Sequence, residues 1–327
     1  MHMPRGFLIA GVAALCLGAA SPPAVAQSYP SKPIRLVVPF PAGGGTDFFA
    51  RTVGAKMSET LGQTIVIDNR PGGSTIIGAE NVKNSPPDGY TVLLGDLGTY
   101  ALNPNLFKKL PYDPVNDLAP VSLTGRFVLT LAVNPTVLNV SSVKELIDAA
   151  KKDPGKIAYA SPGTGSPHHL AMELFAKEAG IKLTHVPYKG AAPAVQDLIG
   201  GQIGLMPLDI AAGMAHIKGG KVRVLGTATP SPVAALPGVP TIASAGLPGY
   251  EAWAWQGFSV PKGTPPDVIA KLRDGYEKAI ADPVVRAKLV EAGIEPLQST
   301  PQEMTSYISA ETGKWSRVIR EGNITLD

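Results

Sequence analysis

Short apolar runs alternate with longer amphipathic segments along most of the chain. The runs 34–38, 64–67 and 90–94 have the length and composition of buried strands, and the segments that follow the first two have helical periodicity. Short apolar strands separated by helices are typical of parallel sheets that are covered on both faces. This part of the sequence therefore predicts a βαβαβ unit.

The same alternation begins again after a proline-rich stretch over 103–120. Strands are predicted at 127–133, 156–160, 184–187, 202–207 and 221–227, with helices between them. A second proline-rich stretch covers 230–249, and helices are predicted at 266–281, 283–291 and 301–321. Capping boxes mark two helix starts, Ser142 with Glu145 and Thr300 with Glu303. The pattern predicts an α/β protein with two doubly wound, mostly parallel sheets.

The C-terminal helices need a sheet to cover, and the first sheet is the nearest one. We therefore expect domain 1 to comprise residues 27–125 and 229–327, with residues 126–228 inserted as domain 2. The chain would then cross twice between the domains, near Gly125 and Gly226, and small residues at these crossings would form a hinge. Two domains in simple tandem are the alternative.

The first 26 residues have the pattern of a secretory signal peptide. Arg5 precedes an apolar run over 7–20, which is too short to span a bilayer, and an A-x-A cleavage site ends at Ala26. Cleavage there would remove Cys16, the only cysteine. We expect an exported, periplasmic protein without disulfides, thiol catalysis or cysteine-bound metal.

Composition and motifs argue against several other classes. The 327 residues include 44% hydrophobic ones, and the net charge of +3 is spread along the chain, so no basic surface for nucleic acid is expected. The five histidines form no H-E-x-x-H motif, and no G-x-S-x-G motif is present. We expect no metal, no cofactor and no enzymatic activity.

Two glycine-rich loops carry the candidate chemistry. Residues 39–47 (PFPAGGGTD) and 161–168 (SPGTGSPH) each join a predicted strand to a predicted helix. Helix N-termini bind anions through free N–H groups and the helix dipole, and ligands of open α/β sheets lie beyond the carboxyl ends of the strands. Two such loops across a cleft would hold a small anion. Neither loop is a Walker A or a dinucleotide-binding motif, so a nucleotide is not expected.

Single polar residues follow other predicted strands. Thr99 is a possible hydroxyl donor to a carboxylate, and Lys189 is a possible counter-charge. Each also has an ordinary structural explanation. A threonine after a strand is often a turn residue, an exposed lysine is common, and Tyr188 can fill a core with its hydroxyl in water.

The segments VVPFPAGGGTD, DNRPGGSTIIGAE, SPGTGSPHHLAMELF and VPYKGAAPAVQDLIGGQI follow one another in this order. Together they resemble the Bug-type periplasmic receptors of tripartite tricarboxylate transporters, over nearly the whole chain after residue 26. The resemblance implies a two-domain periplasmic-binding-protein (Venus flytrap) fold that closes on a small carboxylate. The ligand would be a di- or tricarboxylate, an aromatic acid or an acidic amino acid. A monomeric receptor would deliver it to membrane permease subunits, without a cofactor.

The resemblance also implies which residues bind the ligand. These are Phe40, Gly44, Gly45, Thr46 and Asp47 in the first loop, Ser161, Thr164, Gly165, Ser166 and His168 in the second, and Tyr188, Lys189, Gly190 and Asp209 beyond later strands. Thr99 joins them from its position after the third strand.

Two features depart from the family pattern. Asp96 stands where serine or threonine is expected, and residues 71–75 read PGGST instead of a Gly-Ala-Gly-Gly turn. Asp47 and Asp96 would repel a second carboxylate, or hold an ammonium group or a bridging water. A secreted hydrolase-like enzyme on the same scaffold, and a ligand sensor without transport, are the alternative functions.

Overall fold

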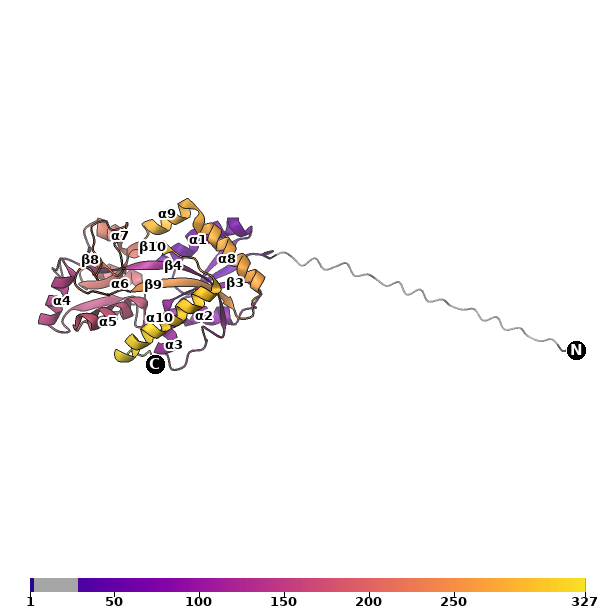
Figure 1. Ribbon diagram of the computed structural model, residues 1–327, viewed down its shortest axis with the longest axis horizontal. Coiled ribbons are helices and arrows are strands. Elements are labelled where there is room, and N and C mark those ends of the chain that lie inside the picture. The colour runs from indigo at the N-terminus through magenta and orange to yellow at the C-terminus, as the bar shows by residue number, and fades with distance from the viewer. Residues whose placement is uncertain (3–28, 327) are drawn as a thin grey trace.

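The computed structural model describes residues 1–2 and 29–326. The predicted signal peptide, with Cys16 and the cleavage site after Ala26, lies outside these residues. Figure 1 shows two α/β halves joined by two long strands, β4 and β9, that run from one half into the other. In the part of the chain that the structure describes, no helix combines the length and the apolar character that a membrane span requires.

The first half contains the predicted βαβαβ unit. Its three strands pair in parallel in the order β2-β1-β3, and their bounds are β1 Ile34–Val38, β2 Ile65–Asn69 and β3 Thr91–Asp96. Helices α1 (Gly45–Leu61) and α2 (Ile76–Lys83) connect these strands, as the hydrophobic pattern predicted. All three strands therefore end at one edge of the sheet, where the first glycine-rich loop emerges.

The second half repeats this arrangement. Strands β7, β5 and β6 pair in parallel, and helices α4 to α7 connect and cover them. The bounds are α4 Val143–Lys152, β5 Ala158–Ser161, α5 Pro167–Ala179, β6 Thr184–Pro187, α6 Ala191–Ile199, β7 Leu205–Asp209, α7 Ile210–Lys218 and β8 Arg223–Thr227. The α/β architecture and both sets of strands agree with the prediction.

The strands that connect the halves are antiparallel to their neighbours. β4 (Leu118–Val133) pairs with β9 (Trp253–Pro261), β10 (Ile294–Pro296), β7 and β8, and β9 also pairs with β3. The parallel arrangement that the sequence predicted holds only away from these crossings. The strand predicted at 127–133 begins earlier, at Leu118, because the sheet accommodates Pro120 at a register shift.

Helices cover the first half on both faces. Phe49 of α1 and Tyr276 of α8 (Pro266–Ala281) belong to one core cluster, which α9 (Pro283–Glu291) completes. On the other face lie a π-helical turn (Gly98–Leu102), α3 (Asn103–Leu106) and α10 (Pro301–Glu321). The predicted capping box of Thr300 and Glu303 is complete at the start of α10, whereas at α4 only Ser142 caps, because the Glu145 carboxylate binds Ser141 instead.

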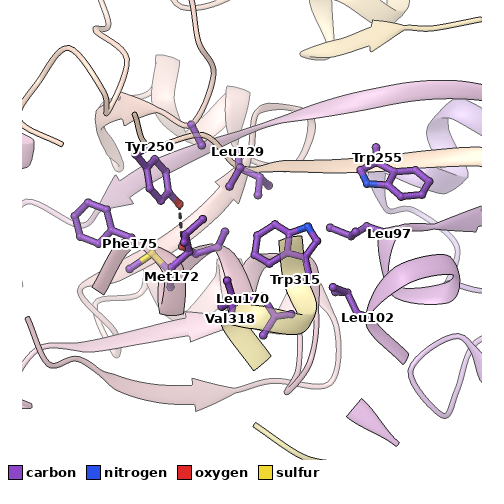
Figure 2. Packing of buried hydrophobic residues seen from close by; sticks show 14 of the residues in the cluster. Leu97, Leu102, Leu129, Leu170, Met172, Phe175, Tyr250, Trp255, Trp315 and Val318 are labelled. Atoms are coloured by element: carbon purple, nitrogen blue, oxygen red, sulfur yellow. Dashed lines mark hydrogen bonds between the residues drawn. The ribbon is translucent and has the colours of Figure 1, made fainter. Parts of the chain in front are cut away.

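Helix α10 links the cores of the two halves. Figure 2 shows Trp315 of α10 between Trp255 and Leu97 on one side and Leu170 of α5 on the other. Further along the same cluster, the Tyr250 hydroxyl donates to the Ala171 carbonyl at 2.8 Å. A single hydrophobic cluster thus extends under the boundary between the halves.

The segment 229–252 packs on the second half. Ile242 donates its N–H to the Thr227 carbonyl at 2.8 Å, and Leu236 shares a small hydrophobic cluster with Ile210 of α7. The sequence assigned this segment to domain 1. Because its contacts are with α7 and β8, we propose that domain 2 extends to about residue 252 and that β9 is the second crossing.

Candidate functional site

The first glycine-rich loop is shaped from within by Asp47. Its carboxylate accepts hydrogen bonds from the Gly43 N–H at 2.9 Å, from Arg51 Nε at 2.9 Å and from Asn69 Nδ2 at 3.0 Å. Burial opposes the charge on Asp47, but these three donors outweigh it and lower the pKa of Asp47. The Asp47 carboxylate is therefore occupied in holding the loop together.

The first turn of α1 carries N–H groups that no described side chain caps. Gly44 is the N-cap residue and has an extended backbone, and within the described residues no side chain caps this end. Gly44, Gly45 and Thr46 are partly exposed, and Phe40 packs against the neighbouring core. The loop therefore has the free donors and the dipole orientation that favour an anion.

The turn that precedes α2 is held in a strained conformation. Ser74 and Thr75 both have left-handed backbones, with φ of 51° and 77°. Asn103 Nδ2 donates to the Ser74 carbonyl at 2.7 Å, and Thr99 Oγ1 lies 2.9 Å from Thr75 Oγ1. Such strain persists only where surrounding contacts hold it, and it is concentrated at functional sites. The sequence flagged this turn, residues 71–75, as unusual, but it gave Thr75 no separate role and did not identify Asn103.

The Thr99 hydroxyl is engaged within the same half. Thr99 N–H and Oγ1 lie 2.9 and 2.8 Å from Asp96 Oδ1, and both residues are buried. Burial raises the pKa of the Asp96 carboxyl despite these hydrogen bonds. Thr99 thus positions Asp96, and the structure does not leave its hydroxyl free for a carboxylate.

The second glycine-rich loop is anchored by two histidines. His169 Nδ1 accepts the Gly165 N–H at 3.1 Å, and His185 Nε2 lies 2.6 Å from Ser161 Oγ. Ser166 caps α5 by accepting the His169 N–H at 3.2 Å, which leaves its hydroxyl proton free to donate. Ser161 is therefore part of the support of the loop, whereas Thr164 and Ser166 are partly exposed on it.

The turn after β6 also contains residues that support the second loop and a residue that is exposed. The Tyr188 hydroxyl donates to Asp197 at 2.7 Å, and its ring packs in a small core cluster. Gly190 is the N-cap of α6, with φ of 107°, and its N–H donates to the Pro162 carbonyl at 2.9 Å. Lys189 is exposed. These residues support the second loop, and Lys189 lies at its rim.

His168, which is buried, pairs with the partly exposed Asp209 in the second half. His168 Nε2 lies 3.0 Å from Asp209 Oδ2. Burial opposes a charge on this imidazole, but Asp209, with a smaller contribution from Asp96, outweighs it and raises the pKa of His168. Asp96 belongs to the first half, so its charge influences a residue of the second half. Within the described chain, His168 Nδ1 and Asp209 Oδ1 are buried and without a hydrogen-bond partner.

The two halves meet at Gly45. A Cβ atom at this position would lie 3.1 Å from the Phe127 ring and 3.8 Å from the Ala211 side chain of α7. Asp209 is the N-cap residue of α7 and makes no capping hydrogen bond there. The first turn of α1 therefore faces the first turn of α7, with Phe127 beside them. The sequence assigned no role to Phe127 or α7.

Candidate chemistry other than anion binding is sparse. Among residues 1–2 and 29–326, no group of three or more histidine, cysteine, aspartate or glutamate side chains is arranged to hold a metal ion. Two shallow grooves lie apart from the loops, one between α7 and α9 and one between α1 and α9. The buried unpartnered atoms beside the loops are thus the strongest candidate site.

Residues 49–324 match the family described as the tripartite tricarboxylate transporter family receptor. The chain belongs to this family. It is 38% identical over 321 residues to a protein encoded between tcbD and tcbE in Pseudomonas sp. strain P51, covering 98% of this chain and 95% of that protein. It is 35% identical over 327 residues to Protein BugT of Bordetella pertussis, covering all of both chains.

Solved structures of related proteins have the same fold. A periplasmic transporter structure has 41% identity and a TM-score of 0.86, covering 92% of this chain and all of the other. An R. palustris protein with adipate has 37% identity and a TM-score of 0.86, covering 91% and 99%. MatC from Rhodopseudomonas palustris, with bound malate, has 31% identity and a TM-score of 0.81, covering 89% and 100%.

These matches confirm three predictions for this receptor. It is a periplasmic solute-binding receptor of the Bug type, it has the periplasmic-binding-protein fold, and its family is not enzymatic. The alternative of a secreted enzyme on this scaffold is therefore not supported.

Proposed function

We propose that this receptor captures a small carboxylate between its two glycine-rich loops and delivers it, as a monomer, to permease subunits of a tripartite transporter. Related structures with adipate and with malate support the ligand class. The observation that carries the proposal is the meeting of α1 and α7 at Gly45, beside the unpartnered atoms of His168 and Asp209.

The structure suggests how the carboxylate is held. The free N–H groups at Gly45 and Thr46 are donors on one side, and the Ser166 hydroxyl and His168 Nδ1 are donors on the other when His168 is protonated. Donors from both halves would converge on one anion. A ligand that contacts both halves stabilises the closed arrangement because it binds that state better.

Export is part of this proposal. We infer that cleavage after Ala26 yields a periplasmic chain that begins at Gln27. Mass spectrometry of the protein from a periplasmic extract tests it. An N-terminus upstream of Gln27 would contradict this cleavage site.

Thermal denaturation with a panel of carboxylates tests the ligand class. The cognate acid, at a hundredfold excess over its dissociation constant, should stabilise the protein by about 2.7 kcal/mol. Added EDTA should leave the shift unchanged. If a neutral sugar raises the melting temperature and no acid does, the proposal is wrong.

A further inference from the structure

Gln256, in the middle of β9, is a buried polar side chain that the site described so far does not use. It is fully buried, and neither its Oε1 nor its Nε2 has a hydrogen-bond partner in the described part of the chain. A carboxamide has two donor hydrogens and an acceptor oxygen, and burying it unpaired is costly. An amide in this state indicates a partner that the protein alone does not supply.

The strand register places Gln256 beside the first loop. Gln256 lies directly opposite Asp96 on β3 and Gly125 on β4, so its side chain projects from the same face of the sheet as the Asp96 side chain and as a Cβ atom at Gly125 would. A Cβ atom at Gly125 would lie 3.5 Å from Phe49 of α1. Phe127, on the same face, is the residue that approaches Gly45. Gln256 therefore lies on the face of the sheet that α1 covers, beside the end of β3 where Asp96 lies.

Asp209 and Gln256 present acceptor atoms that a carboxylate cannot satisfy. Asp209, whose other oxygen pairs with His168, can only accept through Oδ1, and Gln256 accepts through Oε1. A carboxylate has acceptors but no donor. It can bind the free N–H groups, the Ser166 hydroxyl and Gln256 Nε2, but both acceptors would stay unpaired. A plain dicarboxylate thus completes only part of this site.

We propose that the ligand carries a hydrogen-bond donor, a hydroxyl or an amino group, next to its carboxylate, and that Gln256 is the residue that distinguishes such acids from unsubstituted ones. This inference rests on the proposed function and narrows its ligand class. The donor would be accepted by Gln256 Oε1 or Asp209 Oδ1, while Gln256 Nε2 donates to the acid. A site built to hydrogen-bond a hydroxyl rejects the analogue that lacks it, because its own buried polar atoms are then left unpaired.

Pairs of acids that differ by one substituent test the proposal. The probes are malate and succinate, 2-hydroxyglutarate and glutarate, mandelate and phenylacetate, and aspartate with succinate, each titrated calorimetrically into the whole mature protein. In the pair that binds best, the acid with the hydroxyl or amino group should bind at least about tenfold more tightly than the acid without it. Equal affinity within that pair would overturn the proposal, since water would then serve the acceptors equally well.

Gln256→Leu replaces the amide with an apolar side chain of similar volume. It should reduce the preference for the substituted acid to less than about threefold. The matched control is Gln302→Leu, because Gln302 is exposed in the first turn of α10. If Gln256→Leu binds with the full preference, Gln256 is not the discriminating residue.

The outcomes separate this inference from the proposed function. Binding of acids without discrimination overturns the inference and leaves the proposed function standing. If none of these acids binds and a neutral solute does, both are overturned. Should Gln256→Leu fail to fold, the comparison within each acid pair on the unaltered protein still decides whether the ligand needs a donor.

Discussion

The imidazole rings of His169 and His185 stack with their centroids 3.9 Å apart, and both support the second glycine-rich loop. Tyr159 stacks on the His185 ring, and Glu173 lies 3.7 Å from His169 Nε2. Burial, with added repulsion from His185, lowers the pKa of His169 to about 3, and burial lowers the pKa of His185 to about 4. Both rings are therefore neutral in the folded state. For His169 the hydrogen bond also requires this, because its Nδ1 accepts the Gly165 N–H.

These pKa shifts predict that the receptor loses stability in mild acid. Both pKa values lie below the ordinary value of 6.5, so the unfolded chain binds protons that the folded chain does not. The contribution of these two histidines to the free energy of unfolding is complete above about pH 6.5. It falls as the pH drops from there toward about 4. Urea unfolding at pH 7 and at pH 5 should show a lower free energy of unfolding at pH 5. His168, whose pKa is raised, contributes more to the free energy of unfolding as the pH falls, so it opposes this loss.

A variant isolates the contribution of the stacked pair. His185→Phe keeps an aromatic ring but removes one titrating group, so the pH dependence between 7 and 5 should become shallower by up to one proton. An unchanged slope in His185→Phe would show that His185 is not held neutral.

Gly45→Val should weaken ligand binding by about 100-fold or more. A Cβ atom at Gly45 already meets the Phe127 ring at 3.1 Å, and a branched side chain would separate the halves and cover the α1 N–H groups. The backbone at Gly45 is not left-handed, so the effect comes from this contact and not from a forbidden φ.

Gly44→Ala is the matched control for that change. The nearest atom to a Cβ at Gly44 is the Pro41 carbonyl oxygen at 3.9 Å, so an alanine fits there. Calorimetric titration should find nearly unchanged binding for Gly44→Ala. Full-strength binding by a folded Gly45→Val protein would remove the first loop from the site.

Ser166→Ala should affect both stability and binding. Loss of the cap on α5 costs about 1 kcal/mol of stability, and loss of a hydroxyl that donates to the carboxylate costs about 1–3 kcal/mol of binding energy. Ser142→Ala removes the same kind of cap from α4, where Ser142 accepts the Glu145 N–H. Thermal denaturation should show similar losses for both variants, but only Ser166→Ala should lose affinity. Equal affinities would place the Ser166 hydroxyl outside the site.

Lys189→Ala should lose less than about 1 kcal/mol of binding energy, mostly at low salt. Lys189 is exposed at the rim of the second loop, where water and salt screen its charge. Titration at two salt concentrations checks this. A large loss that persists at high salt would mean that Lys189 moves into the closed site and pairs directly with the ligand.

The hydrophobic pattern predicted the elements that depend on neighbouring residues. The extents of α1, α8, α9 and α10 follow from apolar periodicity and capping residues, which act within a few turns. The position of both glycine-rich loops at strand ends follows from the same local alternation. The continuous strand β4 was missed because Pro120 interrupts its pattern, and only pairing with β9 reveals it.

The roles of individual polar residues depended on the tertiary structure. Asp47 and Ser161 stand in the loops that the sequence identified, yet they bond to Asn69 and His185, which fold next to them from other segments. Gln256 had no local motif, and only the strand register brings it opposite Asp96. The sequence by itself determined the fold class, the loops and the family pattern, because these arise from local periodicity and turn chemistry. Which polar atoms face the cleft was decided by the tertiary structure, since a hydrogen-bonding group takes whichever partner the folded chain places within about 3 Å.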